Sequence, residues 1–319
     1  MNLEQHTTPI TVKRIFEHYT AHRKNEHRPH LGGSQIGNEC ERALWYQFRW
    51  AWSPQFSGRQ LRLFETGDRE EERIVRNLRD VGVTVWELDP DTGKQVRFEA
   101  CGGHFALSLD GVGEGFEESS DPHTLEFKTM NAKNFATLKK DGVQKSKPVY
   151  WAQMQVGMHL SGLKRAYFIA VCKDNDDIYA ERVKYDASES IKLIAKAQRI
   201  IDAEKPPARL NDNPAFFKCK FCDYQNLCHY EHLAKTNCRT CAHSTAKPDG
   251  TWHCADKCGT ITYEEQLAGC KNHLFNPNIV PEIWIVHDAG PDFVEYKVND
   301  GRIIRNQNNS DMMHEEWLK

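Results

Sequence analysis

Two acidic residues and a lysine have a spacing that suits metal-dependent hydrolysis. Asp110 is separated by 15 residues from Glu126, which begins the tripeptide Glu126-Phe127-Lys128. Side chains alternate along a strand, so Glu126 and Lys128 are expected on one face and Phe127 in apolar packing on the other. Two carboxylates can hold Mg²⁺ or Mn²⁺, and such an ion polarises a phosphodiester and acidifies a bound water. A lysine beside that water can position it or stabilise negative charge.

Two further polar residues flank this trio along the chain. Glu71 ends the segment Gly67-Asp-Arg-Glu-Glu71, which is expected to open a helix, and Gln153 lies in a predicted helix downstream. Taken alone, an acidic first helical turn is usually solvated and favoured by the helix dipole. A lone glutamine on an amphipathic helix is most often a surface residue. Glu70 and Glu72 flank Glu71, so its register stays open.

The order of these residues resembles that of the PD-(D/E)XK nuclease superfamily, in its RecB-type and phage exonuclease branches. There the first acidic residue helps to hold a metal ion, and a helical glutamine contacts the active site or the DNA backbone. The tyrosine that usually follows this glutamine is replaced here by Gly157, so that part of the motif is absent. The residues that carry the resemblance are Glu71, Asp110, Glu126, Lys128 and Gln153.

Four cysteines have the spacing of a second site. Cys219, Cys222 and Cys228 follow a Cys-x2-Cys-x5-Cys pattern, and Cys40 lies far upstream. Four thiolates suit either zinc or an iron–sulfur cluster, and the spacing does not choose between them. The arrangement resembles the iron–sulfur exonucleases related to RecB and to CRISPR adaptation, over about residues 31–230. That resemblance implies a [4Fe–4S] cluster that joins the two ends of the nuclease fold.

A third group of cysteines lies further along the chain and predicts a structural Zn²⁺ site. The surrounding module has few apolar residues and needs such a staple to fold. It could bind DNA, bind a partner protein or cap the nuclease. Cys258, His253 and His273 are alternative ligands. The favoured set is Cys238, Cys241, Cys254 and Cys270.

Composition indicates a globular chain without a membrane span. Hydrophobic residues make up 39% and charged residues 27% of 319 residues, with a formal net charge of −3. That charge excludes a bulk-cationic nucleic-acid binder, although an enzyme needs only a local basic groove. The polar N-terminus lacks a secretion signal, so a cytoplasmic location is expected. Eleven cysteines there favour metal binding over disulfides, while Cys101 and Cys172 are expected in the core.

Periodicity predicts an α/β fold in which a mixed central sheet is flanked by helices, as in a restriction-endonuclease-like PD-(D/E)XK core. The predicted domains are a nuclease with its iron–sulfur cluster (1–235), a zinc module (236–275) and a short β tail (276–319). Predicted helices span 9–21, 41–50, 67–80, 148–162 and 188–203. Predicted strands span 83–88, 95–100, 105–112, 124–128, 166–172 and 178–184, with a hairpin over 293–306.

Two groups of residues have a conceivable role in DNA binding. One is a set of lysines after the Glu-x-Lys tripeptide, which either lines a phosphate groove or forms a solvated loop. The other is a set of aromatic residues that either stacks on bases or belongs to the core. The lysines are Lys133, Lys139, Lys140, Lys145 and Lys147, and the aromatics are Trp45, Tyr46, Trp50 and Trp52.

The sequence therefore predicts a DNA nuclease dependent on Mg²⁺ or Mn²⁺, most simply an exonuclease acting on linear DNA with a free end. Such an enzyme would serve DNA end processing, recombination or phage DNA metabolism, with a recombination or replication protein as a possible partner. One alternative is a non-catalytic DNA-binding or assembly factor on the same fold. Another is an endonuclease or ribonuclease acting on structured nucleic acid.

Overall fold

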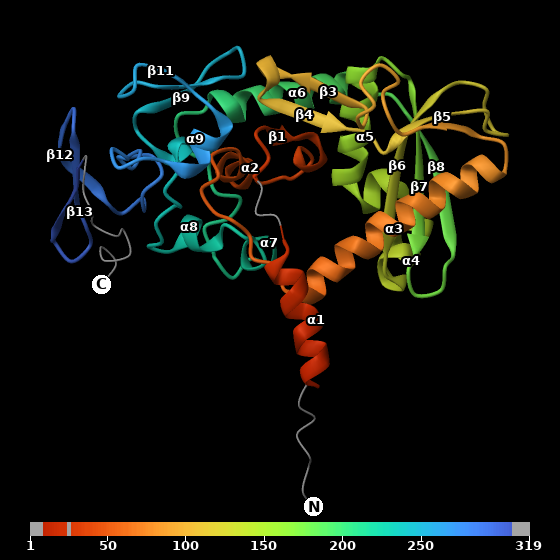
Figure 1. The fold of residues 1–319 in the computed structure, drawn as a ribbon, viewed down its shortest axis with the longest axis horizontal. Helices are drawn as coiled ribbons and strands as arrows, with labels where there is room; N and C mark the ends of the chain where they lie inside the picture. Colours follow the sequence, from red (N-terminus) through yellow and green to blue (C-terminus); the bar gives the residue numbers. More distant parts are fainter. Residues whose placement is uncertain (1–8, 24–26, 308–319) are drawn as a thin grey trace, which may run out of the picture.

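The computed structural model describes residues 9–23 and 27–307. The molecule is elongated, with a large sheet at one end and a small C-terminal sheet at the other (Figure 1). Among the described residues, none of the helices is both long and apolar enough to cross a membrane. The helices of eight residues or more are α1 (Ile10–Ala21), α2 (Glu41–Phe48), α3 (Gly58–Asp80), α4 (Ala132–Ser146), α5 (Pro148–Ser161) and α6 (Ala187–Asp202).

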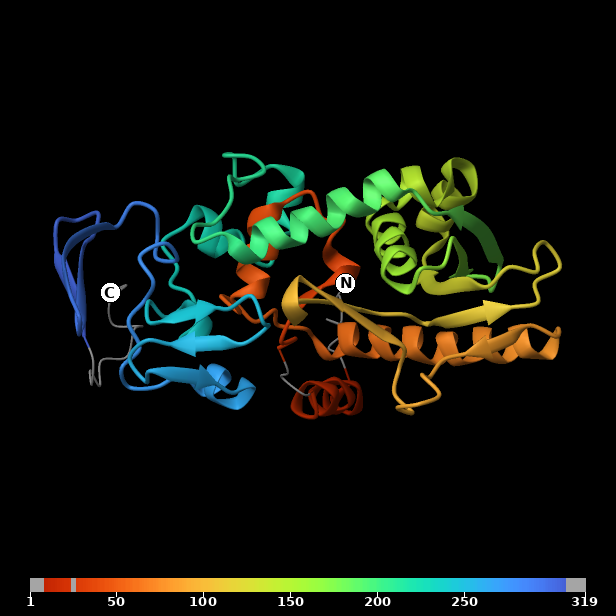
Figure 2. The same ribbon diagram turned by 90° about the horizontal axis from the view of Figure 1, so that it is seen from above.

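The central sheet is mixed, as the strand pattern predicts. Its order is β2-β5-β6-β7-β8, with β6 and β7 parallel and the other neighbours antiparallel. Apolar residues of α3 cover one face, and those of α4 and α5 cover the other (Figure 2). The strands are β2 (Thr84–Trp86), β5 (Gly111–Glu114), β6 (His123–Met130), β7 (Arg165–Cys172) and β8 (Ile178–Lys184).

A second sheet of three strands stands between this core and the cysteine-rich region, in the order β1 (Leu31–Gly32), β4 (Phe105–Ser108) and β3 (Arg97–Ala100). The strand predicted over 105–112 is therefore wrong as one element. Its first half, β4, pairs in this sheet, whereas β5 belongs to the central sheet. Asp110 lies at the junction where the chain passes from one sheet to the other.

Helix α3 begins nine residues earlier than predicted, at Gly58 rather than Gly67. The Ser57 side chain accepts a hydrogen bond from the Gln60 amide, and the Gln60 side-chain oxygen accepts one from the Ser57 amide, which forms a capping box. A Cβ on Gly67 would meet nothing within 4 Å, so this glycine sits in an open helical position. Glu71 is consequently a mid-helix residue and not part of a first turn.

The structure bears on three further expectations. The lysine-rich segment 133–147 is not a loop, since Ala132–Ser146 forms α4, with Gly142 at a φ of 70°. Trp45, Tyr46 and Trp50 are buried, so they belong to the core and cannot stack on bases as placed. Cys172 is buried as expected, but Cys101 is only half-buried, in the short 3₁₀ turn Cys101–Gly103.

The C-terminal third contains two small sheets. The predicted hairpin is present as β13 (Phe293–Lys297) and β14 (Ile303–Gln307), with an additional strand, β12 (Ile285–Gly290), beside it. The cysteine-rich region has a sheet of its own and a short helix, α9. One hydrophobic core runs through all of these parts, from Leu31 to Trp252 and Tyr296. The elements of the cysteine-rich region are β9 (Ser244–Ala246), β10 (Trp252–Cys254), β11 (Gly259–Ile261) and α9 (Tyr263–Ala268).

Arg239 joins the cysteine-rich region to the N-terminal segment. Its guanidinium lies 3.6 Å from the centre of the Trp50 ring and donates hydrogen bonds to the carbonyl oxygens of Phe48 and Pro29. The side chain is 1% exposed, and burial lowers its pKa to about 9. A buried cation held by carbonyl oxygens and an aromatic face fixes the register between the two segments.

The cysteine-rich region also makes a tight backbone contact with the turn Cys101–Gly103, and one added methyl group would disturb it. A Cβ added to Gly102 would lie 1.8 Å from the carbonyl oxygen of Pro248, and its φ is +67°. We expect Gly102→Ala to destabilise the protein by roughly 3 kcal/mol or more, measured by urea unfolding. Gly162→Ala is the control, because Gly162 has a φ of +77° but open space around it. Equal losses for both variants would show that strain alone, and not the contact, matters.

Candidate active site and cysteine clusters

Asp110, Glu126 and Lys128 come together at the edge between the two sheets. The Lys128 ammonium forms an ion pair with Glu126, and its Nζ lies 3.9 Å from Asp110 Oδ2. Asp110 Oδ2 accepts a hydrogen bond of 2.7 Å from the Phe127 amide, which ties the junction loop to β6. Glu126 and Lys128 thus share a face, while Phe127 packs in the apolar cluster beneath α3.

Glu71 approaches the same group from α3. Burial and the charge of Asp110 raise its pKa to about 7, against the opposing charge of Lys128. Glu70 instead pairs with Arg73, at 2.9 Å, and Glu72 is exposed. Of the three consecutive glutamates, Glu71 is therefore the one whose carboxylate acts on the site.

The buried carboxylates repel each other and hold protons into the neutral range. Glu126 is 2% exposed, and burial raises its pKa to about 8 although Lys128 lowers it. Burial alone would lower the pKa of Lys128, but the charges of Glu126 and Asp110 outweigh it and raise that pKa. Lys128 is thus an ammonium at neutral pH. Once those protons are released, three oxygen-donor carboxylates beside one cation would carry excess negative charge, which fits a divalent ion of the hard class.

Gln153 reaches the site from α5. It is 6% exposed and lines a cavity of about 370 Å³ together with Asp110 and Lys128. Gln155, the other glutamine of that segment, is held by the backbone of Lys184 and Asp186 instead. Sequence alone favours Gln153, and its position beside the carboxylates agrees.

Residues that the sequence did not single out complete the cavity. Arg28 and His30 line it from the N-terminal segment, with Ser34 and Gln35 of the 3₁₀ turn η1 (Gly33–Gln35). Arg28 donates to Ser34 Oγ at 3.1 Å. Burial lowers the pKa of His30 to about 4, so this ring is neutral at pH 7. The only sequence signal for this wall is the basic composition of the 22–30 segment.

The lysines of α4 show no common orientation towards the cavity. Lys139 pairs with Asp177 at 2.9 Å, and Lys145 pairs with Asp141 at 2.9 Å. Lys147 donates to the Asn134 side chain. These contacts favour solvated, paired side chains for those three lysines over a phosphate-tracking groove.

Cys40, Cys219, Cys222 and Cys228 line one cavity of about 460 Å³. Burial, together with the charges of Cys40 and Cys228, raises the pKa of Cys222 to about 11. Burial also raises the pKa of Cys228, whereas the charges of Arg42 and Arg209 lower it. Cysteines about 180 residues apart in sequence thus share one pocket, with two guanidinium groups able to offset thiolate charge.

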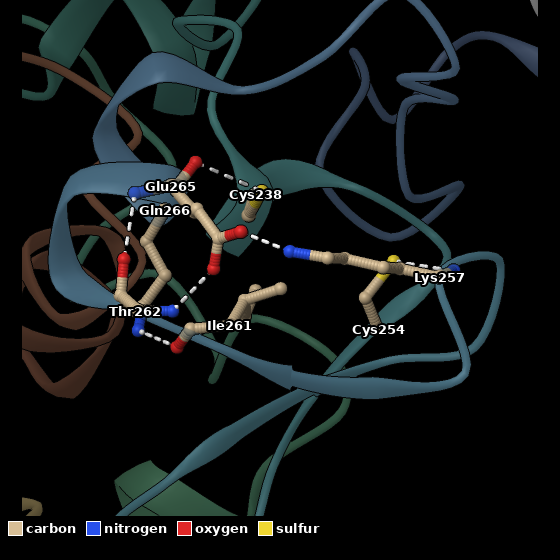
Figure 3. A network of polar contacts seen from close by, with 7 residues as sticks. All are labelled: Cys238, Cys254, Lys257, Ile261, Thr262, Glu265 and Gln266. Atoms are coloured by element: carbon tan, nitrogen blue, oxygen red, sulfur yellow. Dashed lines mark hydrogen bonds and ion pairs between the residues drawn. The ribbon is translucent and has the colours of Figure 1, made fainter.

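The second set of cysteines also lies within electrostatic range of one another. Burial, together with the charges of Cys241, Cys270 and Cys254, raises the pKa of Cys238 to about 12. Cys254 Sγ accepts a hydrogen bond from the Lys257 amide, and Lys257 pairs with Glu265 beside Cys238 (Figure 3). The chemistry of the donor set suits zinc.

Two of the three alternative zinc ligands, Cys258 and His273, make other contacts. The Cys258 thiol is exposed and bonds the Ala255 carbonyl oxygen at 3.2 Å, and His273 Nε2 bonds Thr240 Oγ1 at 3.1 Å. Across the described residues, no set of three or more His, Cys, Asp or Glu side chains already stands in ligating positions for a metal ion. Within each cysteine or carboxylate set, the side chains would therefore have to move closer together to bind an ion.

Comparisons with known proteins give only remote similarities. No protein-family model and no curated protein matches the chain. LHK-Exo, an alkaline exonuclease from Laribacter hongkongensis, is 18% identical, covering 58% of this chain and 90% of its own, with a TM-score of 0.36.

Two further solved structures are similar at the same level. LHK-Exo in complex with dAMP is 18% identical over 59% of this chain and 90% of its own, with a TM-score of 0.41. SSO0001 is 16% identical over 68% of this chain and 93% of its own, with a TM-score of 0.37. Scores this low carry no argument about the present chain, whose site is judged from its own residues.

Proposed function

We propose that the protein hydrolyses phosphodiester bonds of DNA with the aid of Mg²⁺ or Mn²⁺. The observation that carries the proposal is the meeting of three carboxylates and one lysine at the junction of the two sheets. Asp110 and Glu126 would bind the metal ion, and Glu71 would assist from α3. Each comes from a different element, so the arrangement is a product of the fold and not of local sequence.

The electrostatics assign the lysine a role. When bound, the divalent ion would polarise the scissile phosphate and lower the pKa of a water. Lys128 stays protonated at neutral pH because Glu126 and Asp110 raise its pKa, so it is unsuited to accept a proton from that water. Its role is to orient the water and to stabilise charge on the phosphate. Gln153 would contact the water or the DNA, since its side chain lines the same cavity.

The cavity wall suits a phosphate-bearing substrate. Arg28 adds a permanent positive charge, and neutral His30 and the Ser34 hydroxyl add hydrogen-bonding groups. Arginine recognises phosphate oxygens in a bidentate manner. A wall of this kind beside a carboxylate site supports binding of a DNA end, which is why we favour exonuclease action.

The two cysteine sets would act as structural staples. We place a [4Fe–4S] cluster at Cys40, Cys219, Cys222 and Cys228, which would tie the start of the nuclease region to its end. We place Zn²⁺ at Cys238, Cys241, Cys254 and Cys270. A shared pocket supports the first site, and the mutual charges of the thiols support both.

Comparing linear with covalently closed circular DNA tests the proposed activity. With Mg²⁺ or Mn²⁺, the purified protein should degrade linear duplex DNA and leave closed circles intact. Cleavage of closed circles would show an endonuclease, and degradation of RNA in preference to DNA would show a ribonuclease. Binding of DNA without cleavage under any divalent ion would instead support the alternative of a non-catalytic DNA-binding factor.

A further inference from the structure

Two phenylalanines are strongly exposed beside the pocket of Cys40 and Cys222. Phe217 is 73% exposed and Phe221 is 71% exposed, at either end of the short helix α7 (Phe217–Lys220). Their ring centres are 5.4 Å apart in an edge-to-face arrangement. Large apolar side chains normally lie inside a protein, and contiguous exposed ones indicate a contact surface.

Cations accompany the aromatic rings around this pocket. The Lys220 ammonium lies 5.7 Å from the centre of the Phe221 ring, and the Arg23 guanidinium lies 4.4 Å from that of Phe56. Phe56 and Phe221 both line the pocket. Lys218 is already paired with Glu39 at 2.6 Å, so Lys220 and Arg23 are the cations that matter here. Planar rings beside positive charges complement a strand of stacked bases with a phosphate backbone.

The pocket adjoins the candidate active site. Gln35, the last residue of η1, lines the cysteine pocket and also the cavity that contains Asp110 and Lys128. A DNA strand that leaves the active-site cavity past Gln35 would therefore meet the rim of the cysteine pocket. The exposed rings stand where such a strand would need support.

We propose that Phe217 and Phe221 form a stacking platform for a single strand of DNA, next to the active site. The proposal deepens the nuclease function and rests on it for the identity of the strand, namely the unpaired strand at an end being processed. The occupant favoured by the charges is a nucleic acid; an apolar surface for another protein would not need the lysine and arginine beside the rings.

Fluorescence anisotropy tests the platform with a labelled oligonucleotide of about 15 thymidines, near the upper site size of a single-strand binding fold. Binding is measured with Ca²⁺ in an Asp110→Asn background, and gels confirm that the oligonucleotide stays intact. Phe217→Leu/Phe221→Leu keeps apolar surface but removes both rings. Phe217→Trp/Phe221→Trp keeps the stacking faces. Ile178→Ala, at an exposed apolar side chain on β8, is the matched control.

The leucine pair should weaken the Kd for the oligonucleotide by about 10- to 100-fold, because each base stacked on an aromatic ring contributes appreciably. The tryptophan pair and the control should bind like the parent protein. Unchanged binding by the leucine pair would overturn the proposal, as would equal loss in the tryptophan pair. Circular dichroism checks that the exposed substitutions leave the fold intact.

Failure of the platform and failure of the nuclease function have different signatures. Asp110-dependent cleavage together with full oligonucleotide binding by the leucine pair would sink the platform and leave the nuclease standing. Loss of oligonucleotide binding in a protein that cleaves no DNA would overturn the nuclease and retain a single-strand binding surface. Self-association lost in the leucine pair, with DNA binding intact, would assign the rings to a second copy of this chain and overturn the platform.

Discussion

Asp110→Asn should reduce Mn²⁺- or Mg²⁺-dependent cleavage of linear DNA by roughly 10³-fold or more, since it weakens a metal ligand and the charge it supplies. Lys128→Met should have a comparable effect through lost stabilisation of the phosphate. Both changes are close to isosteric, and the rate is followed by release of acid-soluble label from linear duplex.

Two variants serve as matched controls for this loss. Asp121→Asn removes a carboxylate that lies away from the site and pairs with Arg165 at 2.6 Å. Lys192→Met removes an exposed ammonium on α6. Each should retain cleavage close to that of the parent protein. Activity that survives both Asp110→Asn and Lys128→Met would remove the basis of the assignment. Their folded state is checked by thermal melting, because Asp110 also accepts the Phe127 amide.

The second large effect is expected at the iron–sulfur site. Anaerobically purified protein should contain about four irons per chain, and Cys222→Ser should lose nearly all of them. The melting temperature should fall by roughly 10 °C or more, because metal binding in such sites is part of the folding free energy. Without the metal, buried thiols from distant segments would have no bond between them.

Cys258→Ser separates this effect from a general sensitivity of the cysteines. Cys258 is exposed and lies outside both proposed ligand sets, so iron, zinc and melting temperature should stay at their original values. Cys222→Ser should also retain about one zinc per chain, because the second set is independent. Zinc in place of iron in the parent protein would show that the metal at Cys40, Cys219, Cys222 and Cys228 was misassigned.

The order of elements around the site was predictable because it depends on local periodicity. Alternation in β6 places Glu126 and Lys128 on one face, and apolar spacing identifies α3 and α5. The start of α3 was missed because Gly67 looks like a boundary, while the capping box of Ser57 and Gln60 lies outside the apolar repeat. Periodicity finds the middle of a helix better than its end.

What could not be predicted depends on contacts between distant segments. The run 105–112 can be taken for one strand from its sequence, and its change of sheet at Asp110 shows only in the pairing of β4 with β3 and of β5 with β6. The contribution of Arg28 and His30 to the cavity arises from the pairing of β1 with β4. Gly157 has Leu109 and Leu107 within 3.3 Å of where its Cβ would be, and only packing reveals that constraint.

The bonds made by Arg239 have a consequence for biosynthesis. Arg239 and Asn237 hold the carbonyl oxygens of Phe48 and Trp50, and Glu282 pairs with Arg42. A ribosome makes these partners 191, 187 and 240 residues after the segments that they hold. The segment around Phe48 and Trp50 must therefore wait, incompletely packed, until the cysteine-rich region has emerged. Packing of this segment and metal delivery to the cysteines are expected to follow synthesis of that region.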